Sequence, residues 1–254
     1  MLKIRLSLLL ILIATMGCSS SVSDFEDKIE ARVAENNGEM SSLKIKATAI
    51  YLDSWSKKDF YQGDIDKFKE ADKGTSPAKD LILFTGSSSI RFWSTLKEDM
   101  VPHNVLNRGF GGAHISHVNY HFNEIVKPYK PKAIVFFCGT NDLSAFKTPE
   151  ETFEDFSEFF SMVKNELPGT KLIVIGVKPS TARKFLISEE QEFNSLISNL
   201  AEEEDLLSYV SVWNSMLTNE GNANPALFVE DGLHMNKKGY EIWTKLVKPE
   251  IDKL

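Results

Sequence analysis

The run Leu81-Ile82-Leu83-Phe84-Thr85-Gly86-Ser87-Ser88-Ser89-Ile90, residues 81–90, decides the fold. It joins an apolar stretch with the length of a buried strand to a glycine-led turn that presents a hydroxyl at the start of a helix. A helix start favours a negatively charged oxygen, because the helix dipole is positive there. The run therefore predicts a buried β-strand that delivers a serine to one edge of a sheet.

Working outward from this run, further apolar stretches of similar length lie at residues 104–107, 133–138, 172–177 and 209–213. Stretches with helical spacing separate them, and this alternation predicts a parallel sheet joined by right-handed crossovers. The predicted fold is an α/β, three-layer α/β/α sandwich with a five-stranded parallel sheet. In such sheets function sits at the carboxyl ends of the strands.

Two of the expected helices have starts that resemble capping boxes. Thr148 and Glu151 flank Pro149, which suits the first helical position. Ser188 and Gln191 repeat the pattern ahead of another apolar stripe. We expect helices to begin at Thr148 and at Ser188.

The amino-terminal segment has the layout of a signal peptide. Lys3 and Arg5 precede an apolar run over 6–13, and Cys18 follows a small residue and is itself followed by serines. This site resembles a bacterial lipoprotein processing site, which predicts a lipid anchor at Cys18 after removal of residues 1–17. Secretion without a lipid, or a retained membrane anchor, is the alternative.

Length and composition predict one folded domain with short extensions. The 254 residues are too few for two comfortable domains. Residues 18–42 are polar and charged, which indicates a flexible, mobile tether, and the domain is expected over 43–254, with two short helices within 45–72.

Charge and cysteine content exclude several classes of function. The net charge is −7, and loss of Lys3 and Arg5 with the signal peptide makes it −9, which disfavours nucleic acid as a partner. Cys18 is assigned to the lipid, and Cys138 lies in an apolar run, where a buried thiol is expected. The two cysteines form neither a disulfide framework nor a cysteine metal site.

Three more polar segments stand where chemistry is expected. Residues 107–112 form a glycine-rich turn after the second predicted strand, and residues 139–142 place an amide after the third. In residues 228–234, Asp231 precedes His234 by three positions, so the carboxylate can orient the imidazole. Each segment alone also fits an ordinary cap, tight loop or turn.

In this order and spacing, the four segments resemble those of the SGNH or GDSL hydrolase superfamily, and the resemblance covers residues 46–254. It implies a flavodoxin-like α/β fold. The resemblance implies that Ser88 is the nucleophile, His234 the general base and Asp231 its orienting carboxylate. It also implies an oxyanion hole made by the Ser88 amide, the Gly112 amide and the Asn141 side chain. No cofactor or metal is implied.

The nucleophile segment departs from the usual family signature. Ser87 stands where Asp is usual and Ser89 where Leu is usual, although the turn pattern still selects the middle serine, Ser88. Arg108, beside the glycine turn, is a candidate for binding a substrate carboxylate or sugar hydroxyl. The equally weighted alternative is that Arg108 holds the loop by a salt bridge.

The sequence also contains features of two other kinds of hydrolase. His114, His117 and His121 share one side of a helix at their spacing and could hold a metal, but no His-Glu-x-x-His element accompanies them, so exposed or capping histidines are favoured. An α/β-hydrolase elbow is disfavoured because Ile90 replaces its second glycine.

The expected function is a serine esterase of the cell envelope, in the outer membrane or periplasm if the host is Gram-negative. The expected substrates are short-chain or acetyl esters of glycans, by location and by family. The alternatives are a lysophospholipase or lipase-type acylhydrolase, and a non-catalytic surface lipoprotein that binds glycans.

Overall fold

The computed structural model describes residues 21–35 and 37–254. They belong to two compact units, Met1–Ser54 and Trp55–Leu254. The predicted signal peptide, 1–17, and the predicted lipid site, Cys18, lie outside the described residues. Among the residues that are described, no helix is both long and apolar enough to cross a membrane.

The first unit contains helix α1 (Val22–Glu35) and most of α2 (Ser42–Trp55). The composition of 18–42 indicated a mobile tether, but α1 is a regular helix in which Phe25 and Ile29 are buried four positions apart. Apolar residues one helical turn apart share a face, but this spacing is obscured in the sequence by the many charged residues around it. The role of the segment as a link to a membrane stays a prediction.

The second unit is built on the predicted five-stranded parallel sheet, which confirms the fold class. The order of its strands is β2-β1-β3-β4-β5. The strands are β1 (Ile82–Gly86), β2 (Val105–Gly109), β3 (Ala133–Phe137), β4 (Lys171–Ile175) and β5 (Leu207–Val210). Every residue of β1 and β3 is buried, as expected of central strands covered on both faces.

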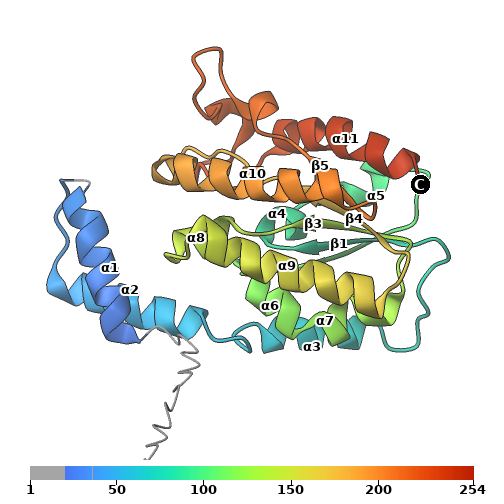
Figure 1. Ribbon diagram of the computed structural model, residues 1–254, viewed down its shortest axis with the longest axis horizontal. Helices are drawn as coiled ribbons and strands as arrows, with labels where there is room; N and C mark the ends of the chain where they lie inside the picture. The colour runs from blue at the N-terminus through green and yellow to red at the C-terminus, as the bar shows by residue number, and fades with distance from the viewer. Residues whose placement is uncertain (1–20, 36) are drawn as a thin grey trace, which may run out of the picture. The chain divides into compact units, whose positions relative to one another are not determined.

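Helices cover both faces of the sheet (Figure 1). A hydrophobic cluster lies between the sheet and the helices on each face. Alternate strand residues point to opposite faces, so Ile134 and Phe136 enter one cluster while Val135 and Phe137 enter the other. The first face is covered by α3 (Gln62–Ala71), α6 (Ile115–Tyr120), α7 (Phe122–Ile125), α9 (Pro149–Glu166) and α10 (Ile187–Glu203). The second face is covered by α4 (Ser88–Arg91), α5 (Leu96–Asp99) and α11 (Lys237–Asp252).

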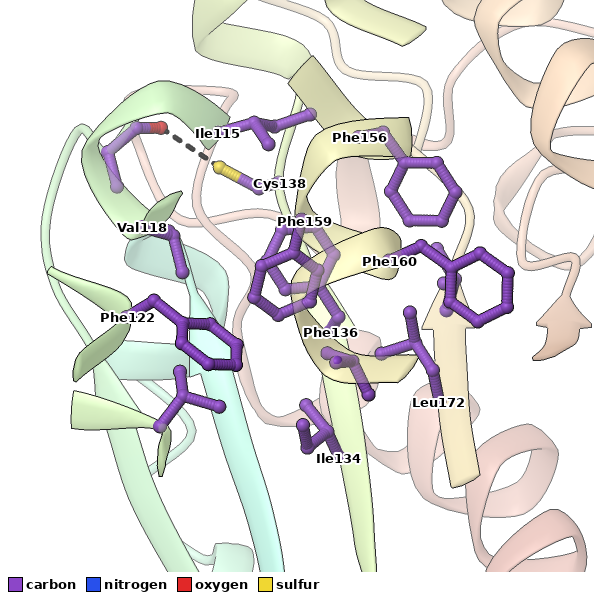
Figure 2. Packing of buried hydrophobic residues seen from close by; sticks show 14 of the residues in the cluster. Ile115, Val118, Phe122, Ile134, Phe136, Cys138, Phe156, Phe159, Phe160 and Leu172 are labelled. Carbon is purple, nitrogen blue, oxygen red and sulfur yellow. Dashed lines mark hydrogen bonds between the residues drawn. The ribbon is translucent and has the colours of Figure 1, made fainter. Parts of the chain in front are cut away.

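Aromatic packing fixes α9 against the sheet (Figure 2). The rings of Phe136 on β3 and Phe159 on α9 stack with centroids 4.4 Å apart, and Phe122 meets Phe159 edge-on at 6.0 Å. Cys138 is buried as predicted, and its Sγ donates to the Ala113 carbonyl at 3.2 Å. Burial raises the pKa of this thiol, which keeps it neutral.

The two predicted helix starts have different outcomes. Thr148 Oγ1 accepts from the Glu151 amide at 3.1 Å and the Glu151 carboxylate accepts from the Thr148 amide at 2.8 Å, so this capping box is confirmed. The prediction for Ser188 is wrong, because α10 begins at Ile187 and has no side-chain cap. A short 3₁₀ turn over Lys184–Leu186 leads directly into α10 and replaces the expected cap.

Candidate active site

Ser88 follows the interior strand β1, close to its carboxyl end. Gly86 ends the strand with φ +120°, and a Cβ there would lie 2.1 Å from the Phe137 carbonyl oxygen, so the turn needs glycine. Ser87 precedes α4 in an extended conformation, and Ser88 is the first residue of the helix. The sequence thus places the half-buried Ser88 hydroxyl at a helix start above the sheet.

The loop before α11 brings an imidazole to this hydroxyl. His234 Nε2 lies 3.0 Å from Ser88 Oγ, and His234 Nδ1 lies 2.6 Å from Asp231 Oδ2. The other carboxylate oxygen, Oδ1, accepts from the amides of Leu233 at 2.8 Å and His234 at 2.9 Å. One carboxylate therefore fixes both the loop backbone and the ring.

The ionisation of Asp231 determines the tautomer of His234. Partial burial acts to raise the pKa of this carboxyl, but hydrogen bonds from the His234 ring and from the two loop amides lower it to about 2. An ionised carboxylate only accepts hydrogen bonds, so Nδ1 carries the ring proton and Nε2 is the acceptor that faces Ser88. Phe92 meets the ring edge-on, with centroids 4.9 Å apart, and adds an apolar contact.

Two of the predicted oxyanion donors converge on one oxygen. Asn141 lies on α8 (Thr140–Ser144), directly after β3, and is buried. Its Nδ2 donates to Ser87 Oγ at 3.0 Å, and the Ser88 amide donates to the same hydroxyl oxygen at 2.6 Å. The structure therefore brings Ser88 and Asn141 together around a point that the Ser87 hydroxyl occupies.

Gly112 lies in the loop between β2 and α6. Its φ is +74°, and a Cβ would lie 2.3 Å from the Tyr61 hydroxyl, so a larger residue would be strained. Trp55 Nε1 donates to the Gly112 carbonyl at 2.9 Å, and the next residue, Ala113, accepts from Asn141 Nδ2 at 3.0 Å. The glycine loop is thus tied directly to the Asn141 side chain.

Asp142, next to Asn141, anchors the other side of that loop. Its carboxylate oxygens accept from the Ile115 amide at 3.1 and 3.3 Å, and Lys147 Nζ lies 3.7 Å away. Complete burial raises the pKa of Asp142 to about 7, although Lys147 and the amide act in the opposite direction. The buried carboxyl joins α8 to the start of α6.

Arg108 is engaged elsewhere. Its Nε donates to the Tyr129 hydroxyl at 2.6 Å, its Nη1 donates to the Asn107 carbonyl at 3.0 Å, and its Nη2 pairs with Asp72 just after α3. The side chain is buried and lies over the Phe68 ring. Of the two predicted roles, the structure favours the salt bridge, and the substrate-binding role is not supported.

The three histidines that follow the glycine loop are neither exposed nor arranged around a metal. All three are buried, so the prediction of exposure is wrong. His117 Nδ1 accepts from the His114 amide at 2.9 Å, which gives His117 a capping role, while His121 Nδ1 lies 2.9 Å from Glu124 Oε1. Burial lowers the pKa of His117 to about 4. Within residues 21–35 and 37–254, no group of three or more His, Cys, Asp or Glu side chains suits a metal ion.

The loop over residues 176–186, which follows β4, also belongs to the site and was not predicted from the sequence. Lys178 Nζ donates to the Leu233 carbonyl at 2.7 Å, and Arg183 Nη1 donates to Asn141 Oδ1 at 3.0 Å. This loop therefore supports both the imidazole loop and the Asn141 side chain. Its position after a predicted strand, at the edge that carries the other segments, is the signal that could have identified it.

The sequence also matches a known family. The profile of the GDSL-like Lipase/Acylhydrolase family matches residues 74–242, about two thirds of the chain. The matched span holds Ser88, Gly112, Asn141, Asp231 and His234.

The chain belongs to the GDSL-like lipase/acylhydrolase family. The hydrolase accordingly acts on ester bonds. No curated protein matches its sequence.

Solved structures share the fold of the hydrolase at low sequence identity. A GDSL-like lipase from Bacteroides thetaiotaomicron is 22% identical, with a TM-score of 0.62 over 78% of this chain and 98% of its own. A Streptococcus pneumonia protein described as a candidate platelet activating factor is 17% identical. Its TM-score is 0.69, and the match covers 84% of this chain and 100% of its own. An acetylxylan esterase from Geobacillus stearothermophilus is 16% identical. Its TM-score is 0.56, and the match covers 69% of this chain and 95% of its own.

Proposed function

We propose that this hydrolase is a serine esterase in which Ser88 is the nucleophile, His234 the general base and Asp231 the carboxylate that orients the ring. The observation that carries the proposal is the 3.0 Å contact between His234 Nε2 and Ser88 Oγ, with the opposite ring nitrogen bound to Asp231. A nucleophile in contact with a base that a third group orients is the arrangement required for acyl transfer.

In the first step, Ser88 Oγ attacks the ester carbonyl carbon while its proton passes to His234 Nε2. The resulting imidazolium is stabilised by the Asp231 carboxylate, whose low pKa of about 2 keeps it ionised at neutral pH. His234 then gives the proton to the leaving alcohol, and an acyl group remains on Ser88. Water, activated by the same imidazole, releases the acyl group as a carboxylic acid.

The negative charge that develops on the carbonyl oxygen is held by the Ser88 amide, the Asn141 side chain and, by family resemblance, the Gly112 amide. The first two already converge on the Ser87 hydroxyl, and we infer that the substrate oxygen takes its place. Loss of one such donor typically lowers kcat by about 10²–10³-fold.

The proposed substrates are acetyl or other short-chain esters of glycans. Arg91 supports a hydroxyl-rich leaving group, because its exposed guanidinium lies beside the glycine loop, with Nη1 3.0 Å from where a Cβ on Gly111 would stand. The acetyl esters are suggested by fold neighbours described as an acetyl esterase and an acetylxylan esterase.

We also propose that the hydrolase is anchored in the cell envelope through a lipid on Cys18. The support is the order of Lys3, Arg5, the apolar run over 6–13 and Cys18 in the sequence. An envelope location agrees with a glycan substrate, since glycans are abundant there.

The test is hydrolysis of p-nitrophenyl esters from acetate to palmitate, with Ser88→Ala as the matched control. We expect acetate to be preferred and Ser88→Ala to lower kcat at least about 10³-fold. A preference for palmitate would favour a lysophospholipase or lipase, to be followed with lysophospholipids. Activity that is equal in the wild type and Ser88→Ala would refute the assigned nucleophile, and absence of any hydrolysis would favour glycan binding without catalysis.

A further inference from the structure

The loop over 176–186 contacts the amide that we assign to the oxyanion hole. Arg183 Nη1 donates to the Asn141 side-chain oxygen Oδ1 at 3.0 Å and to the Thr140 carbonyl at 3.1 Å. Arg183 lies 42 residues after Asn141 in the chain, outside the four segments that carry the family resemblance. It therefore reaches the site only because β4 ends at the same edge of the sheet as β3.

The contact determines which way the Asn141 amide faces. A guanidinium only donates hydrogen bonds, so it requires the amide oxygen on its side. The amide nitrogen Nδ2 then faces the opposite way, where it donates to Ser87 Oγ at 3.0 Å and to the Ala113 carbonyl at 3.0 Å. In the flipped amide, NH₂ would face the guanidinium and the oxygen would face the Ala113 carbonyl, so both contacts would be repulsive.

Charge adds to this geometric effect. Burial lowers the pKa of Arg183, opposed by the Glu190 carboxyl, but a guanidinium stays charged throughout the neutral range. A positive charge on the amide oxygen draws electron density from Nδ2 and strengthens its N–H as a donor. The same charge stabilises a negative oxygen bound by Asn141.

The rest of the loop holds the opposite side of the site. Lys178 Nζ donates to the Leu233 carbonyl at 2.7 Å, while Thr181 Oγ1 and the Ala182 amide both lie 3.1 Å from the Gly232 carbonyl, which accepts their hydrogen bonds. The loop thus joins the Asn141 turn to the segment that carries His234. Arg183 is the one residue of this set whose contact ends on an assigned oxyanion donor.

We propose that Arg183 is a positioning residue for ester hydrolysis: it fixes and polarises the Asn141 amide so that Nδ2 donates to the oxyanion. The proposal rests on the esterase function proposed above. Because Arg183 acts through Asn141, its removal lowers the stability of the transition state more than that of the bound substrate. Its effect falls on kcat, whereas a residue that binds the substrate equally in both states would change KM.

The first test compares Arg183→Ala and Arg183→Met with Lys184→Ala, which removes the neighbouring positive charge. Arg183→Met keeps an apolar stem for packing if Arg183→Ala destabilises the fold. We expect both Arg183 variants to lower kcat for p-nitrophenyl acetate about 10- to 100-fold with KM within about threefold, somewhat less than loss of a whole donor. Lys184→Ala should have the same kcat and KM as the wild type. An unchanged kcat in folded Arg183→Met, or a raised KM alone, would overturn the proposal.

The decisive test is the double-mutant cycle with Asn141→Ala. If Arg183 acts through Asn141, then Arg183→Met should lower kcat less than about threefold once Asn141 is Ala, because the amide is already gone. Equal losses in both backgrounds would show that Arg183 acts independently of Asn141. Failure of the proposed function itself is seen separately, as full activity in Ser88→Ala.

Discussion

At the scale of single residues, the three consecutive serines after β1 have three different environments. His234 Nε2 contacts only the hydroxyl of Ser88 among them, at 3.0 Å. Ser87 Oγ accepts from the Ser88 amide and from Asn141, and Ser89 is buried, with its carbonyl bound to the Tyr240 hydroxyl at 2.9 Å. The local sequence alone does not show which of the three serines is the nucleophile candidate. The contact with the His234 imidazole selects Ser88.

This difference predicts how Ser87 and Ser88 respond to substitution. Ser87→Ala removes a hydroxyl that fills the proposed oxyanion position but leaves Ser88 and His234, the proposed nucleophile and base, in place. We expect kcat for p-nitrophenyl acetate to stay within about tenfold of the wild type, against a loss of at least about 10³-fold in Ser88→Ala. Labelling with a fluorophosphonate, followed by mass spectrometry, should place the adduct on Ser88 in the wild type and in Ser87→Ala. An adduct on Ser87 would reverse the assignment.

Residue types and spacing predicted the contact between two site residues where they are close in sequence, but not where the contacting residues are far apart in the chain. Asp231 and His234 are three positions apart, so their contact could be anticipated from the sequence. Arg108 and Arg183 look alike in sequence, each in a polar segment after a predicted strand, yet Arg108 pairs with Asp72 and Arg183 with Asn141. These partners lie 36 and 42 residues away, and only the folded chain selects them.

At the scale of the elements, β1 and β3 were predicted well because they are short, mainly apolar runs that are buried on both faces. The last strand was predicted over 209–213 but lies at Leu207–Val210, where a polar serine interrupts the apolar run. Helix starts depend on competing local interactions and were predicted less well. Thr148 has Pro149 after it and caps α9 as expected, whereas a 3₁₀ turn already orders the chain before Ser188. The helix α1 was missed because its charged residues dominate the composition.

The capping box of α9 provides a prediction at this scale. Thr148→Ala removes the side-chain oxygen that accepts from the Glu151 amide and leaves that amide without its partner. We expect the free energy of unfolding to fall by about 1 kcal/mol, measured by urea denaturation, with little change in esterase activity. Ser188→Ala is the matched control, because Ser188 does not cap α10, and it should change stability by less than about 0.5 kcal/mol. Equal losses in both variants would contradict the assignment of the cap.

At the scale of the whole molecule, the sheet order brings the chemistry together. With β1 and β3 adjacent at the centre, Ser88 and Asn141 follow neighbouring strands, and the loop after β4 lies beside them. The sequence could predict that these segments share an edge, because parallel strands end on the same side. The ties among them that fix side-chain orientation, such as Trp55 to Gly112, depend on contacts over long sequence separations.

A fully buried carboxyl predicts how stability depends on pH. Burial raises the pKa of Glu190 to about 8, against the opposing effects of Lys178 and Arg183, and neither carboxyl oxygen has a hydrogen-bond partner. Between its ordinary pKa and about 8, the folded state binds more protons than the unfolded state, so this group makes stability fall as pH rises.

We therefore expect Glu190→Gln, which cannot titrate, to lose less stability than the wild type between pH 5 and pH 8. The difference should exceed about 1 kcal/mol, since one pKa unit corresponds to about 1.4 kcal/mol. Urea denaturation at the two pH values measures it, with the exposed Glu192→Gln as control. A parallel pH dependence in Glu190→Gln and the wild type would contradict the prediction.

The proposed envelope anchor also belongs to this scale. Cys18→Ser removes the thiol to which a lipid would be attached, so the protein should move from the membrane fraction to the soluble fraction on expression in a bacterial host. Metabolic labelling with a fatty-acid analogue should mark the wild type and not the variant. Cys138→Ser is the control, because Cys138 is buried in the core and should not affect labelling. Label retained by Cys18→Ser would exclude this site.

The contact between Ser88 and His234 spans 146 residues of the chain. Beyond His234, α11 adds the fully buried Trp243 and Ile251 to the cluster that also contains Ile90 of α4. During synthesis, the nascent polypeptide therefore carries Ser88 long before it carries His234 or the helix that completes that layer. Under the mechanism proposed above, ester cleavage requires residues 234–252 to have emerged from the ribosome and folded, so an incomplete translation product would be inert toward the esters of the cell that makes it.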